Sequence, residues 1–160
     1  IEIIEERVGK KAEKNLLPLQ PGDVLLADRT TRGTAEPGEI VVFDGRGYFA
    51  PSAADGDRYW VKRVIAVGGQ AVHCCDADGA ITVDGTELEE HYLPEGTAPS
   101  RIEFDLVVPA GHMFVLGDNR TDSTDSRHLL GAPGGGMIPV DRVVGEADRI
   151  VWPLTRRGAL

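Results

Sequence analysis

The chain has no long apolar run of the kind that crosses a membrane. Its longest uncharged, apolar-leaning run covers residues 106–116 and contains Pro109, Gly111 and His112. A membrane-spanning helix needs about 20 apolar residues. The sequence therefore predicts no transmembrane helix, and its first residues, which begin with Ile1, do not resemble a signal peptide.

Cysteine is nearly absent, because Cys74 and its neighbour Cys75 are the only two. The histidines are scattered along the chain at His73, His91, His112 and His128. Two adjacent thiols without organised histidines do not make a zinc site, so we expect no metal. Adjacent Cα atoms lie about 3.8 Å apart, below the usual range for a disulfide, which favours two reduced or partly buried thiols. In an oxidising compartment, a disulfide between the two neighbouring cysteines stays an alternative.

Positive charge is also scarce, with 17 basic residues against 26 acidic ones and a net charge of −9. This balance argues against a nucleic-acid partner, which would need a basic surface. It also argues against electrostatic docking to anionic lipid. The 160 residues, 41% of them hydrophobic, are enough for one domain with a sizeable core.

The remaining pattern predicts an all-β, antiparallel fold. Twenty glycines and ten prolines suit a loop-rich β architecture. Strands are expected where β-branched and aromatic residues run between turn signals, over residues 24–28, 40–43, 59–67, 71–74, 81–83, 102–108, 113–116 and 143–151. Residues 45–57 are expected to form a polar insertion, and residues 131–136 a flexible loop. Apolar residues near the N-terminus have roughly helical spacing, at Ile1, Ile4, Val8 and Ala12.

One lysine lies within an apolar strand pattern. Alternation over residues 59–67 places Trp60, Lys62, Val64 and Ala66 on one face. A lysine amine ordinarily has a pKa near 10.4, and burial can lower this pKa by several units. A buried neutral amine would suit a general base. The alternative is a lysine whose stem lies along the sheet while its amine reaches water.

A dense polar segment, residues 117–127, follows the apolar run 113–116. Its residues are Gly117-Asp118-Asn119-Arg120-Thr121-Asp122-Ser123-Thr124-Asp125-Ser126-Arg127. These are ordinary turn residues, but they are also dense in groups that form specific hydrogen bonds. We call this segment the site box. It is either an ordinary turn or a functional site, and the second interpretation is favoured by the general rule that function concentrates in loops held by a rigid scaffold.

Together these segments resemble type I signal peptidases, membrane-bound serine/lysine proteases that remove signal peptides from exported proteins. The lysine strand matches in Tyr59-Trp60-Val61-Lys62-Arg63-Val64-Ile65, and the site box in Gly117-Asp118-Asn119-Arg120 followed by Ser123-x-Asp125-Ser126-Arg127. Flanking motifs follow in family order, and the resemblance covers about 140 of the 160 residues. Cys74-Cys75-Asp76-Ala77 resembles the actinobacterial branch.

The resemblance implies a role for each matching residue. Lys62 would be the general base that activates a serine hydroxyl, and Ser123 would orient its amine. Arg63 and Arg127 would pair with carboxylates of the site box. The supporting residues would be Gly117, Asp118, Asn119, Arg120, Asp125, Arg127 and Arg63. No cofactor and no metal are implied.

The nucleophilic serine of the family has no counterpart in this chain. The family has Ser-Met-x-Pro-Thr-Leu before a Gly-Asp pair, whereas no serine precedes Ser52 here. Alignment on Pro18 puts Asn15 in the nucleophile slot, and alignment on the Gly-Asp pair puts Lys14 there. Three explanations stay open: a natural pseudoenzyme, an altered N-terminal segment, or an imperfectly recorded active-site segment.

The resemblance also implies an architecture and a setting. Residues 1–160 would form one catalytic domain, with a smaller β subdomain inserted at about residues 69–108. It would act on signal peptides of preproteins at the outer face of the cytoplasmic membrane, held there by an anchor that this chain lacks. One alternative is an inactive homologue that binds signal peptides or extended chains along an exposed strand. A second is a self-cleaving repressor-type peptidase, which shares the Ser/Lys chemistry.

Overall fold

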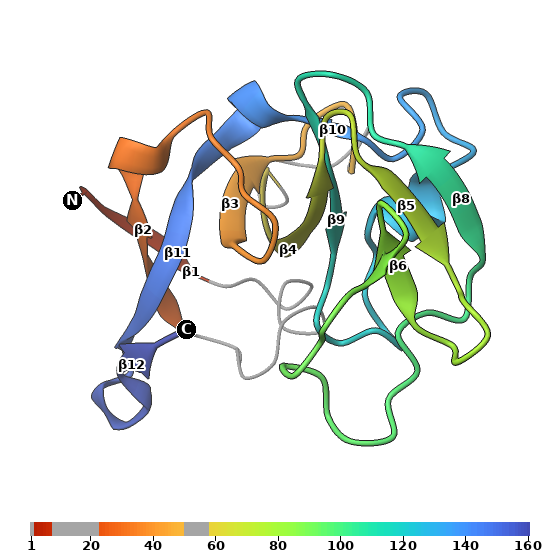
Figure 1. Cartoon of the computed structure of the whole chain (residues 1–160). Coiled ribbons are helices and arrows are strands. Elements are labelled where there is room, and N and C mark those ends of the chain that lie inside the picture. The colour runs from red at the N-terminus through yellow and green to blue at the C-terminus, as the bar shows by residue number, and fades with distance from the viewer. Residues whose placement is uncertain (1, 8–22, 50–57) are drawn as a thin grey trace.

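The computed structural model describes residues 2–7, 23–49 and 58–160, and these include all eight predicted strands. Two antiparallel sheets account for most of the regular secondary structure among these residues (Figure 1). The larger sheet has eight strands among the described residues, in the order β1-β2-β11-β3-β4-β9-β10 with β12 beside β11. The smaller has four, in the order β7-β6-β5-β8.

The larger sheet is assembled from both ends of the chain. Its strands are β1 (Glu2–Arg7), β2 (Val24–Asp28), β3 (Ile40–Asp44), β4 (Tyr59–Val67), β9 (His112–Leu116), β10 (Ile138–Pro139), β11 (Val143–Trp152) and β12 (Gly158–Ala159). The smaller sheet comes from one continuous stretch, with β5 (Ala71–Cys74), β6 (Ile81–Val83), β7 (Thr86–Glu87) and β8 (Phe104–Val107). Short 3-10 turns are η1 (Arg29–Thr31), η3 (Ser126–Leu129), η4 (Val140–Arg142) and η5 (Leu154–Arg156). In Figure 1 the smaller sheet lies on the far side of β9 from the chain termini.

Strand β4 lies inside the larger sheet, paired with β3 on one edge and β9 on the other. Its register with β9 slips by one residue between Val64 and Ala66, which leaves Ile65 as a bulge. Trp60 and Val64 therefore pack in one apolar cluster, whereas Ile65 and Ala66 both pack in the next. The expectation that Ala66 shares a face with Trp60, Lys62 and Val64 is wrong, because a bulge interrupts the alternation.

The core has three apolar clusters, and one of them joins the two sheets. That cluster combines Val72, Ile81 and Phe104 of the smaller sheet with Phe114 and Leu116 of β9. The rings of Phe104 and Phe114 lie 5.1 Å apart between centroids. The smaller sheet therefore packs on the core, while the division of the chain at residues 69–108 stays a prediction.

Most strand predictions are confirmed, and three local expectations are wrong. Strand β8 covers only Phe104–Val107 of the predicted 102–108. The helical spacing near the N-terminus is misleading, because Glu2–Arg7 is a strand paired with β2; residues 8–22 lie outside the described part. Within the expected polar insertion, Phe49 is buried between Phe43 and Trp60, at ring distances of 5.4 and 5.3 Å.

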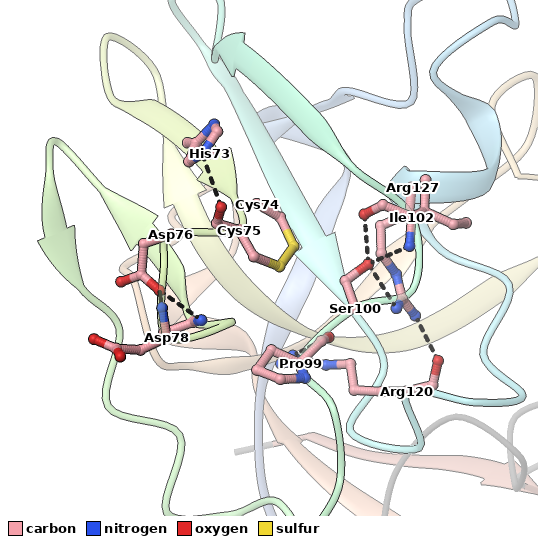
Figure 2. The surroundings of a disulfide bond; sticks show 11 residues. His73, Cys74, Cys75, Asp76, Asp78, Pro99, Ser100, Ile102, Arg120 and Arg127 are labelled. Carbon is pink, nitrogen blue, oxygen red and sulfur yellow. Dashed lines mark hydrogen bonds between the residues drawn. A yellow bond between two sulfur atoms is a disulfide. The ribbon is translucent and has the colours of Figure 1, made fainter.

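The two cysteines form a disulfide between neighbouring residues. Cys74 ends strand β5 and is buried in the cluster that joins the sheets, and Cys75 packs against that cluster. The expectation of two reduced thiols is therefore wrong. Figure 2 shows the bridge close to Pro99 and Ser100, on the loop that precedes β8.

Candidate active site

Strands β4 and β9 bring Lys62 and the site box together. Arg63 is opposite Leu116 in the register, so the box leaves β9 directly beside the lysine. The Lys62 side chain is fully buried, and its Nζ lies 5.5 Å from the centroid of the Trp60 ring. The alternative of an amine reaching water is thereby excluded.

The amine of Lys62 donates a hydrogen bond to the hydroxyl of Ser123, with 3.2 Å between Nζ and Oγ. Burial lowers the pKa of Lys62 to about 7, against weaker opposing effects of the Asp125 and Asp118 charges, while the charge of Arg127 lowers it further. At pH 7 about half of the molecules therefore carry a neutral amine, compared with about one in 2500 for a lysine in water. Such an amine can accept a proton.

The turn after β9 sets the position of Ser123. The carbonyl oxygen of Asn119 accepts hydrogen bonds from the backbone N–H of Ser123 at 2.9 Å and of Asp122 at 3.2 Å. The Asn119 side chain accepts a further bond from the hydroxyl of Thr121. Because these bonds close the turn on itself, the buried Ser123 hydroxyl is presented to Lys62 from a fixed backbone.

Asp125 is the buried anchor of the site box. Its carboxylate accepts two hydrogen bonds from the Arg127 guanidinium, at 2.8 and 2.7 Å, and one from the backbone N–H of Gly117 at 3.1 Å. Burial opposes ionisation of Asp125, but the hydrogen bond and charge of Arg127 outweigh it and lower the pKa. Asp125 and His128 also form the capping box of η3. The expected pairing of Arg127 with a box carboxylate is confirmed.

Arg63 pairs with the second box carboxylate, as expected. Its guanidinium donates to both oxygens of Asp118, at 2.9 and 2.7 Å, and to the carbonyl oxygen of Gly38 at 2.8 Å. Arg120, also buried, donates from Nε to the carbonyl oxygen of Gly117 at 3.0 Å. The structure thus gathers the seven supporting residues named from the sequence around Lys62 and Ser123; their functional roles remain a proposal.

Sequence reasoning missed several residues that contact the box. The hydroxyl of Ser126, which belongs to the matching motif but not to the supporting residues named from the sequence, accepts a hydrogen bond from the backbone N–H of Val115. Three residues of one loop, about 30 residues away in the chain, contact the arginines: Glu90, Tyr92 and Ser100. No periodicity marks that loop, and nothing in its composition separates it from an ordinary turn.

The nucleophile slot, Asn15 or Lys14, lies outside the described residues. Within the described ranges no cluster of three or more His, Cys, Asp or Glu could hold a metal ion. What the described residues provide is a buried amine, a hydroxyl hydrogen-bonded to it and a charged shell around both.

Comparison with known proteins decides the family. Residues 9–152 match the family described as signal peptidase, peptidase S26. The chain belongs to this family. Within it, the chain is 31% identical over 189 aligned positions to a probable signal peptidase I of Mycobacterium leprae, covering 87% of this chain and 64% of that protein. It is 36% identical to a signal peptidase I of Mycobacterium tuberculosis, covering 87% and 60%.

A solved structure supports the same assignment. A signal peptidase I from Enterococcus faecalis matches with a TM-score of 0.52 and 25% identity, over 71% of this chain and 96% of that one. The all-β signal-peptidase fold and the actinobacterial-like signal peptidase I resemblance predicted from the sequence are therefore confirmed. The chain spans about 60% of the length of the mycobacterial relatives. None of the described helices is long and apolar enough to cross a membrane.

Proposed function

We propose that this chain is the catalytic domain of a signal peptidase I, a serine endopeptidase that removes signal peptides from exported preproteins. The observation that carries the proposal is the fully buried Lys62 amine, 3.2 Å from the Ser123 hydroxyl. Few folds would accept a buried lysine without using its neutral form. The relatives named signal peptidase I support the substrate class.

In the proposed reaction Lys62 is the general base. It takes the proton of a serine hydroxyl as the oxygen attacks the scissile carbonyl, and it returns that proton to the leaving amine. An acyl-enzyme ester results, and water activated by the same amine then hydrolyses it. Ser123 aims the amine throughout. Because the pKa of Lys62 is about 7, the amine is in the accepting form over the neutral and mildly alkaline range.

The nucleophile itself is the open element of this mechanism. Neither Asn15 nor Lys14 has a hydroxyl, so neither can form the ester that a serine forms. Without a hydroxyl in this slot, the unaltered chain would bind the substrate and leave it uncleaved. A second candidate function, an inactive homologue that binds signal peptides, is favoured by this one observation. The proposed setting is the outer face of the cytoplasmic membrane.

The deciding experiment measures cleavage of a preprotein in detergent by the given chain and by Asn15→Ser and Lys14→Ser variants. We expect one serine variant to cleave, and its activity to rise with pH through about 7 as Lys62 loses its proton. Adding Lys62→Met to that variant should abolish cleavage. The matched control is Thr86→Ala, whose exposed hydroxyl lies on β7 of the smaller sheet.

Each other outcome has a definite meaning. If the given chain cleaves and Lys62→Met stops it, the assignment of the nucleophile slot is wrong and another hydroxyl serves. If no variant cleaves but a signal peptide still binds, the binding homologue is the correct function. Cleavage that survives Lys62→Met would contradict the Ser/Lys mechanism altogether.

A further inference from the structure

Three arginines connect the active site with a loop of the smaller sheet, residues 88–101, between β7 and β8. The guanidinium of Arg63 stacks on the ring of Tyr92, 3.8 Å from its centroid. Arg120 donates from Nη1 to the carbonyl oxygen of Pro99 at 2.8 Å, and Arg127 donates from Nη1 to the hydroxyl of Ser100 at 3.4 Å. Figure 2 shows Pro99 and Ser100 beside these last two arginines.

The opposite side of each guanidinium holds the site box. Arg63 binds Asp118, Arg127 binds Asp125, and Arg120 binds the carbonyl oxygen of Gly117. Arg127 also donates to the carbonyl oxygen of Arg120, at 3.1 Å. Every arginine therefore has one set of contacts on the loop and another on the box, so a displacement of the loop is transmitted to both carboxylates.

Glu90 and Tyr92 form the centre of the loop contact. The hydroxyl of Tyr92 donates to Oε1 of Glu90 at 2.8 Å, and Nη2 of Arg120 donates to the same oxygen. The Arg120 and Glu90 side chains are only 1% and 6% exposed. Burial raises the pKa of Tyr92, so its hydroxyl stays protonated and keeps donating. The buried Glu90–Arg120 ion pair therefore lies beside a ring that covers one face of the Arg63 guanidinium.

We propose that Glu90 and Tyr92 are positioning residues, which hold Arg63 and Arg120 against the site box and thereby keep the Lys62–Ser123 pair aligned and dry. They touch neither Lys62 nor Ser123 themselves. The inference rests on the proposed function only in treating Lys62 as the base. It assigns a catalytic purpose to the smaller sheet, which otherwise contributes no residue to the pair.

The physical consequence of losing this contact concerns the environment of Lys62. The charged groups around its amine are Asp118 and Asp125, which raise its pKa, and Arg127, which lowers it. Burial is the largest influence. Without the Tyr92 ring, water reaches the Arg63–Asp118 pair, and Arg63 is freer to leave Asp118. Both changes favour the charged amine.

The test compares Tyr92→Leu with Tyr92→Phe, which keeps the ring over Arg63 and removes only the hydroxyl. Carbon-13 lysine NMR reports the Lys62 pKa, and the chain has only three other lysines, Lys10, Lys11 and Lys14. We expect Tyr92→Leu to raise the Lys62 pKa by about one unit and Tyr92→Phe to move it by less than half of that. Glu89→Gln is the matched control, because Glu89 lies on the same loop with its side chain exposed.

Amide hydrogen exchange gives a second, independent readout, and it includes Glu90. We expect Glu90→Gln and Tyr92→Leu to speed exchange of the Ser123 amide by about tenfold, because the turn that holds it loosens. Glu89→Gln should leave the rate unchanged. If Tyr92→Leu does not fold, Tyr92→Met, whose longer and more flexible side chain adapts to the space of the ring without an aromatic face, replaces it with the same expected shifts.

The outcomes separate this proposal from the proposed function. A folded Tyr92→Leu or Tyr92→Met chain with an unchanged Lys62 pKa and unchanged Ser123 exchange would overturn the positioning role, whatever the protease assay shows. A Lys62 pKa near its ordinary value in the unaltered chain would instead count against Lys62 as the base. The effect of Tyr92 on that pKa and on exchange would still be measurable.

Discussion

At the scale of single residues, the proposed chemistry depends most on Lys62. Its buried amine lies 3.2 Å from the hydroxyl of Ser123. Burial disfavours the charged form of this amine, so the neutral form, which can accept a proton, is present near pH 7. The two carboxylates nearest in the site box are each held by an arginine, so they do not pair with the lysine directly. In the proposed mechanism, that arrangement keeps Lys62 available as a base near neutral pH.

The pKa of Lys62 makes a prediction about stability against pH. In the unfolded chain this amine binds a proton up to about pH 10.4, but in the folded chain it releases the proton above about 7. Between these values the unfolded state binds more protons, so the free energy of unfolding rises with pH, by at most about 1.4 kcal/mol per pH unit. Lys62→Met lacks this contribution.

Urea unfolding of both chains at several pH values from about 6 to 9 checks this prediction. The stability of the unaltered chain relative to Lys62→Met should increase across that range, because the other titrating groups are common to both. Parallel pH profiles would show that the amine titrates near its ordinary pKa when folded.

At the scale of elements, the turn η3 closes the site box, because Asp125 of the box caps it. The glycine loop that follows, residues 131–136, packs against η3. Gly136 has a φ of +75°, and a Cβ added there would lie 2.4 Å from the carbonyl oxygen of Ser126. Gly135 has a similar φ of +61°, but its Cβ would meet only Leu130, at 3.9 Å. Alanine substitutions at both glycines would introduce backbone strain, but only the one at Gly136 would also introduce a steric clash. Comparing the two variants therefore isolates the effect of the clash.

We predict that Gly136→Ala destabilises the fold more than Gly135→Ala. The positive φ costs each alanine about 1–2 kcal/mol, and the clash adds about 1–3 kcal/mol at Gly136 alone because it pushes on backbone. Thermal or urea unfolding of the two variants measures the difference. Equal losses of stability would mean that the loop moves away from Ser126 without cost.

At the scale of the whole molecule, the shared cluster determines how the two sheets behave together. Phe104 and Val72 of the smaller sheet are buried against Phe114 of β9, and the arginines add polar connections from the other side. A subdomain that buries its apolar face only on the core has little reason to be stable alone.

We therefore predict that the smaller sheet unfolds together with the core in one transition. Tryptophan fluorescence follows the larger sheet through Trp60 and Trp152, and hydrogen exchange of β5 and β6 follows the smaller one. The two should give the same urea midpoint. If the amides of β5 and β6 lose their protection at a lower urea concentration than the one at which the fluorescence changes, the smaller sheet unfolds independently, contrary to this expectation.

The sequence predicted the strands well where local patterns were strong and failed where distant contacts decide. Strands β2, β4, β5 and β6 have the expected bounds, because β-branched runs end at clear turn signals. The apolar spacing around Ile4 suggested a helix, yet pairing with β2 makes that segment a strand. Ile65 bulges because of its register against β9, which the sequence of β4 does not contain.

By itself the sequence determined the fold class, the family and the two segments that meet at the site, since composition, alternation and motif order are local properties of the chain. Only the tertiary structure decided that Lys62 is fully buried beside Ser123, and that Glu90 and Tyr92 complete the arginine shell. Burial and contacts between distant segments depend on how both sheets pack. A linear pattern that marks a residue as apolar or polar does not specify the neighbours that will surround it.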